Sequence, residues 1–64
     1  MPSVKSTAIA FVDYNDQNKE LFITFRQGDT YTYHGVPAHI YASLLNARSV
    51  GTYFNDHIKD KYAQ

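Results

Sequence analysis

The segment from Lys19 to Arg26, KELFITFR, shows the clearest two-residue alternation in the chain. Its apolar residues Leu21, Ile23 and Phe25 fall on one face of an extended backbone, and mostly polar residues fall on the other. This alternation is typical of a strand with one buried face. The sequence therefore predicts a sheet that is covered on one side.

Two more strands are expected, at Thr7 to Tyr14 and at Thr30 to His34, both rich in β-branched and aromatic residues. In the first of them, Ile9 and Val12 are three positions apart and break the alternation. A β-bulge near Ala10–Phe11 would return both side chains to one face. Because short, turn-rich segments join the three strands, we predict an antiparallel meander.

The second half of the chain is predicted to form two helices, from Pro37 to Ala47 and from Val50 to Lys61. Proline suits the first helical turn, and Ser49 is placed to cap the second helix. Apolar residues recur at helical spacing in both segments. They are Val36, Ile40, Tyr41, Leu44 and Leu45, followed by Val50, Tyr53, Phe54, His57 and Ile58. We predict one α+β domain over residues 1–64, a three-stranded antiparallel β-meander with two C-terminal helices packed on one face.

Composition limits the classes of function. The chain has 64 residues, with six Lys and Arg against six Asp and Glu, so its net charge is zero. Autonomous nucleic-acid binders usually carry a basic excess, and this balance argues against tight binding to DNA or RNA. With no Cys, the chain has neither a disulfide nor a thiolate metal site. It shows no signal peptide and no apolar run near the ~20 residues of a membrane span, so we expect a cytoplasmic protein.

The order of these signals resembles the KTSC domain, a short module found at the C-terminus of some lysyl-tRNA synthetases and also as a free-standing bacterial or phage protein. The resemblance covers nearly the whole chain. It is carried by the strand from Ser6 to Tyr14, Leu21, Ile23 and Phe25 with Arg26-Gln27-Gly28, Tyr31 and Tyr33, Gly35-Val36-Pro37, Tyr41 with Leu44-Leu45, the block from Ser49 to Asn55, Ile58-Lys59 and Tyr62. It implies a binding module for which RNA has been suggested as the ligand, and it brings no catalytic residues.

The central Tyr31-Thr32-Tyr33 segment, called the YxY segment below, is the first candidate site. Its two tyrosines share one face of their strand. If that face is exposed, the rings could stack on nucleic-acid bases, and if the helices cover it, they belong to the core or its edge. Large rings dominate the cores of small domains, which favours the second interpretation.

A second candidate is the start of the second helix, with Arg48, Ser49 and Gly51. Free N–H groups at a helix N-terminus can accept a phosphate, although the same residues also make an ordinary helix cap. Lys59 could add positive charge nearby. Because Asp56 and Asp60 flank it, a solvated face of mixed charge is the simpler interpretation.

No enzyme or cofactor is predicted. His34, His39 and His57 have no i, i+4 partner and no Cys beside them, so a metal site is not expected. A triad of Ser49, His57 and an Asp lacks a nucleophile elbow.

Two hypotheses about function remain. In the first, the chain binds RNA weakly through Tyr31, Tyr33, Arg48, Ser49, Gly51 and Lys59. In the second, it is a protein-interaction or homodimerisation module, monomeric or weakly dimeric, that uses Phe22 and the uncovered face of the sheet. An exposed aromatic patch bordered by Arg and Lys would favour the first, and an apolar patch without basic neighbours would favour the second.

Overall fold

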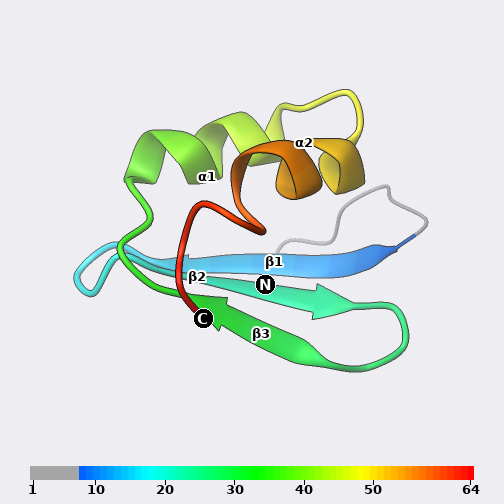
Figure 1. Cartoon of the computed structure of the whole chain (residues 1–64), viewed down its shortest axis with the longest axis horizontal. Helices are drawn as coiled ribbons and strands as arrows, with labels where there is room; N and C mark the ends of the chain where they lie inside the picture. Colours follow the sequence, from blue (N-terminus) through cyan, green and yellow to red (C-terminus); the bar gives the residue numbers. More distant parts are fainter. Residues whose placement is uncertain (1–7) are drawn as a thin grey trace.

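The computed structural model describes residues 8–64, and it contains three strands followed by two helices (Figure 1). The strands are β1 (Ile9–Asn15), β2 (Glu20–Phe25) and β3 (Thr30–Tyr33), and the helices are α1 (Ala38–Leu45) and α2 (Val50–His57). The strands form one antiparallel sheet in the order β1-β2-β3. Both helices lie on the same face of it (Figure 1), and the predicted α+β class is confirmed.

The irregular alternation of the first strand is explained by a bulge. Ile9 pairs with Phe25, whereas Phe11 pairs with Thr24, so Ala10 is one residue too many on β1. The bulge lies where the sequence predicted it. Because of it, Val12 reaches the same side as Ile9, and both side chains are fully buried.

The core lies between the sheet and the two helices. Its buried residues are Ile9, Val12, Leu21, Ile23, Tyr33, Val36, Leu44, Val50, Phe54 and Ile58. Phe25, expected on the same face as Leu21 and Ile23, is partly buried against this cluster. Two residues of the predicted stripes are exposed: Leu45, at 39% exposure, ends α1, and His57 ends α2.

Both helices are shorter than predicted. Pro37 is the N-cap residue of α1, and Asn46 ends the helix by donating its side-chain N–H to the Ala42 carbonyl (2.9 Å). The helix α2 ends at His57, before the predicted end at Lys61. The N–H groups of Ile58 and Lys59 both bond to the Phe54 carbonyl, and this turn redirects the chain. The turn places Ile58 fully in the core.

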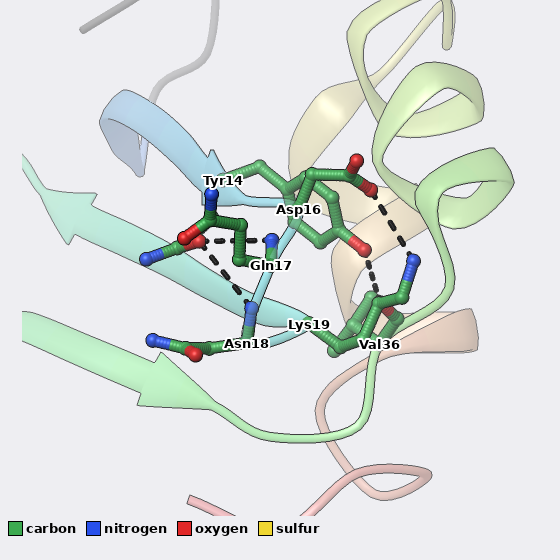
Figure 2. A network of polar contacts seen from close by, with 7 residues as sticks. Tyr14, Asp16, Gln17, Asn18, Lys19 and Val36 are labelled. Carbon is green, nitrogen blue, oxygen red and sulfur yellow. Dashed lines mark hydrogen bonds and ion pairs between the residues drawn. The ribbon is translucent and has the colours of Figure 1, made fainter.

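The β1–β2 hairpin is tied to the connection between β3 and α1 (Figure 2). The Val36 N–H donates to the Lys19 carbonyl (2.9 Å), and the Tyr14 hydroxyl donates to the Val36 carbonyl (2.6 Å). Within the loop, the Asn15 side-chain oxygen accepts backbone N–H groups, and Lys19 pairs with Asp16 at 3.2 Å. Both backbone polar groups of Val36 are thereby satisfied in the interior.

The opposite face of the sheet carries no helix (Figure 1). Phe11 is 41% exposed there, and Phe22 is half-buried on the neighbouring strand. The Thr24 and Thr30 hydroxyls share a hydrogen bond across the strands, and Glu20 contacts His34. This face is a mixed surface of threonines and charged groups with two separate rings. No helix within residues 8–64 is long and apolar enough to cross a membrane.

Candidate functional site

An open groove of about 630 Å³ begins at the end of the sheet away from the β1–β2 hairpin and extends along β3 to Tyr33 and Gln64. All three strands contribute to it, together with α2 and the segment that follows α2. The described residues that line this groove, called the aromatic groove below, are Ala8, Ile9, Phe25, Gln27, Tyr31, Tyr33, Gly51, Phe54, Asn55, Lys59, Asp60 and Gln64. Its volume is in the range of about 300–1,000 Å³ typical of ligand pockets.

Four rings in edge-to-face contact line the groove. Tyr31 meets Phe25 with centroids 5.4 Å apart, Phe25 meets Phe54 at 5.7 Å, and Phe54 meets Tyr33 at 5.5 Å. The interplanar angles of 62°, 74° and 70° are those favoured by aromatic quadrupoles. The rings therefore hold one another in place and present a preformed apolar surface.

The two tyrosines of the YxY segment have different environments, although they share one face of β3. Tyr33 is only 3% exposed because it packs under α2 against Phe54, whereas Tyr31 is 37% exposed. Tyr31 lies two residues earlier on β3 and contacts the ring of Phe25. Tyr33 thus belongs to the core, and Tyr31 is an accessible ring at its edge.

Polar groups complete the groove. Gln27, Asn55 and Gln64 contribute carboxamides, each able to donate and accept hydrogen bonds. The Gln27 amide nitrogen donates to Asp29 (3.0 Å). Among the described lining residues, Lys59 and Asp60 carry opposite charges, so the groove has no excess of either sign.

The turn after α2 brings Lys59, Asp60 and Gln64 to the groove. If α2 had continued to Lys61, Lys59 and Asp60 would have stayed on its surface. Instead the chain leaves the helix axis at Ile58 and runs down to the end of β3 (Figure 1). There the His34 N–H donates to the Ala63 carbonyl (2.8 Å).

The groove brings together four of the sequence-predicted site residues, Tyr31, Tyr33, Gly51 and Lys59. It does not include the other two. Ser49 caps α2, where its hydroxyl oxygen accepts the Thr52 N–H (3.3 Å) and hydrogen-bonds with the Thr52 hydroxyl (2.9 Å). Arg48 is exposed just before that cap and is not among the lining residues.

Sequence reasoning missed the remaining polar residues of the groove. Gln27 lies in the β2–β3 turn, Asn55 on α2 and Gln64 beyond both helices. No spacing pattern connects three amides this far apart in the chain. Phe25 could have been found from the sequence, because it is the last residue on the apolar face of its strand, after Leu21 and Ile23.

A shifted pKa is found away from the groove, at Tyr41. Among the described residues, burial raises the pKa of the Tyr41 hydroxyl above its ordinary value of 10.0, with a smaller contribution from the Asp13 carboxylate. Tyr41 stacks on Tyr14 at the hairpin end of the sheet and is not a lining residue. Within residues 8–64, no group of three or more His, Asp or Glu side chains is placed to hold a metal ion.

Comparison with known proteins identifies the family. The model of the KTSC domain matches residues 5–62. This chain belongs to the KTSC domain family. A crystal structure of a KTSC domain protein from Yersinia pestis superimposes with a TM-score of 0.93 at 35% identity, over 97% of this chain and 87% of that one. The predicted family is thereby confirmed.

Curated relatives extend over almost the same length. A protein of Tsukamurella paurometabola is 34% identical over 97% of this chain and 92% of its own length. An uncharacterized protein of Stutzerimonas stutzeri is 28% identical over 94% of this chain and 84% of its own. The names of these two relatives state no ligand or activity.

Proposed function

We propose that this KTSC domain is a non-catalytic binding module that holds a segment of another protein in the aromatic groove. The observation that carries the proposal is an accessible tyrosine, Tyr31, at the edge of a rigid aromatic surface with a charge-balanced rim. Buried anchors at protein interfaces are enriched in Tyr, and a preformed ring surface costs little conformational entropy when a partner binds.

The charges favour a protein segment over a nucleic acid. A polyphosphate backbone would pass both Lys59 and Asp60, and these opposite charges would largely offset each other. Arg48 does not line the groove, and the whole chain has zero net charge. In contrast, a peptide without excess charge could use the three carboxamides for hydrogen bonds and the rings for an apolar side chain.

Single-stranded RNA is a second candidate, supported by the presence of both an exposed ring and Lys59 in the groove. Stacking of one base on Tyr31 would contribute about 1–3 kcal/mol. With Lys59 as the main phosphate contact, the slope of log K against log salt would be only about −0.7. Such binding would be weak, and its dependence on salt would be small.

A peptide selection tests the proposal without a known partner. Linear 12-residue peptides displayed on phage are selected against the folded chain, and the enriched sequences are synthesised and titrated by NMR. We expect binding that is weakened at least tenfold by Tyr31→Ala and left unchanged by Phe11→Ala. Phe11 is the matched control because it is a similarly exposed ring on the opposite face of the sheet, where it pairs with Thr24.

Two results would contradict the proposal. One is a failure to enrich any peptide over the Tyr31→Ala protein. The other is an equal loss of binding in the two variants, which would place the contact outside the groove. A parallel titration with uridine and adenosine hexanucleotides tests the second candidate, for which Lys59→Gln should remove most of the salt dependence.

A further inference from the structure

The strand β3 lies at one edge of the sheet, so half of its backbone groups point away from β2. Tyr31 pairs with Ile23 and Tyr33 pairs with Leu21. In the same register, the Phe25 N–H bonds to the Asp29 carbonyl (2.8 Å). Because hydrogen-bonded and outward residues alternate along an antiparallel strand, the backbone groups of Tyr31 and Tyr33 face β2. Those of Thr30, Thr32 and His34 point outward.

The protein's own chain uses the last of these outward positions. The His34 N–H donates to the carbonyl of Ala63, in the segment that descends from α2 (Figure 1). This bond shows that an outward backbone N–H directly after β3 already pairs with another segment of the chain. For the backbone groups of Thr32 and Thr30, the described residues supply no partner on the outward side.

The open part of the edge lies beside the aromatic groove. Tyr31, between the two threonines, points to the helix side of the sheet and lines the groove. A strand added beside Thr30 and Thr32 would direct alternate side chains to that same side. One of them would then face Tyr31 and the rim formed by Lys59 and Asp60.

We propose that the partner segment binds as a fourth strand on β3, paired through the backbone of Thr30 and Thr32, with one large apolar side chain seated in the aromatic groove. This inference rests on the proposed function and specifies its partner as an extended segment without excess charge. Strand addition of this kind takes its affinity from main-chain hydrogen bonds and its specificity from a side-chain pocket.

The edge itself has few of the usual protections against pairing. Natural edge strands are blunted by Lys, by Pro or by bulges, and β3, with the sequence TYTY, contains none of these. Its shortness limits the added ladder to the two threonines. A helical or nucleic-acid ligand in the groove would leave these backbone groups unpaired, so the edge favours an extended peptide.

An N-methyl scan of the selected peptides separates strand addition from docking through side chains alone. Each backbone N–H of the peptide is replaced in turn by N–CH₃. The dissociation constant of each modified peptide is then measured with the wild-type protein. We expect losses of at least tenfold at alternate residues, those paired with Thr30 or Thr32, and little change at the residues between them. Amide exchange at Thr32 should slow on binding, whereas exchange at Thr52 on α2 serves as the control.

The outcomes distinguish this inference from the proposed function. If Tyr31→Ala abolishes binding but N-methylation has no alternating effect, the groove binds the peptide and the strand model is wrong. If no selected peptide depends on Tyr31, both proposals fail. An alternating effect with unchanged binding to Tyr31→Ala would place the added strand on another edge and overturn the inference.

Discussion

The tyrosines at the two ends of the sheet have different environments. At the hairpin end, the Tyr14 hydroxyl bonds to the Val36 carbonyl (Figure 2). Its ring stacks on Tyr41, with centroids 5.1 Å apart and an interplanar angle of 16°. At the groove end, Tyr31 meets the edge of Phe25 and remains 37% exposed. The first end is closed by the connection into α1, whereas the second is left open.

This contrast suggests that one end of the sheet stabilises the fold and the other binds a ligand. A chain of 64 residues buries only about 60% of its unfolded surface, so each large ring matters to the core. Tyr14 joins the hairpin to the connection before α1, which makes its role structural. Tyr31 makes one ring contact, with Phe25, and we expect its accessible ring to serve a ligand more than the fold. The variants below test this difference directly.

The largest difference is expected from truncating each ring to alanine. Tyr14→Ala removes the hydrogen bond, the stack on Tyr41 and a half-buried ring, and should lower the free energy of unfolding by about 2–3 kcal/mol. Tyr31→Ala should lower it by about 1 kcal/mol or less, because the ring is exposed and keeps one aromatic contact. Urea unfolding followed by circular dichroism measures both. Equal losses would mean that Tyr31 is structural as well.

Removing only the hydroxyls should give a smaller and cleaner difference. Tyr14→Phe keeps the ring but leaves the Val36 carbonyl without its side-chain donor, at a cost of about 1–2 kcal/mol. Tyr31→Phe should change stability by about 0.5 kcal/mol or less, in keeping with a surface position. The urea midpoints of the variants are compared, provided that the dependence of the unfolding free energy on urea concentration is unchanged. A Tyr14→Phe protein as stable as the wild type would show that this hydrogen bond does not stabilise the closed end.

The smallest effect concerns alkaline pH. Burial, followed by the Asp13 carboxylate, raises the pKa of Tyr41 above 10.0, so the folded state holds this proton more tightly than the unfolded state. Its contribution to stability is complete below pH 10.0 and is lost as the pH rises through the raised value. Between about pH 8 and about pH 11, the melting temperature of the wild type should therefore fall more than that of Tyr41→Phe. If the melting temperatures of the two proteins fall equally over this pH range, the raised pKa of Tyr41 does not contribute to stability and the prediction is wrong.

Much of the fold could be predicted because its signals are local. The alternation of Leu21, Ile23 and Phe25, the irregular spacing that requires a bulge at Ala10, and the cap at Ser49 each depend on residues close together in the chain. The predicted end of α2 was wrong, because the apolar periodicity alone let the helix continue to Lys61. It ends at His57, and the turn that follows places Ile58 in the core.

The candidate site was only partly predictable. The YxY segment was found from its sequence, but its face alone did not reveal that Tyr33 is buried while Tyr31 is exposed. That difference arises because Tyr33 packs against Phe54 of α2, whereas Tyr31 contacts Phe25 of β2. The charged pair Lys59 and Asp60 reaches the groove only because α2 ends early.

By itself, the sequence determined the class of the fold, the family, and the buried faces of β1 and β2, because periodicity and turn chemistry act over a few residues. Only the tertiary structure decided that one end of the sheet is closed and the other is open. The aromatic groove joins residues from Ala8 to Gln64, and the edge of β3 becomes significant only beside it. Such contacts are set by how the helices and the last segment pack over the sheet, and no local pattern encodes that packing.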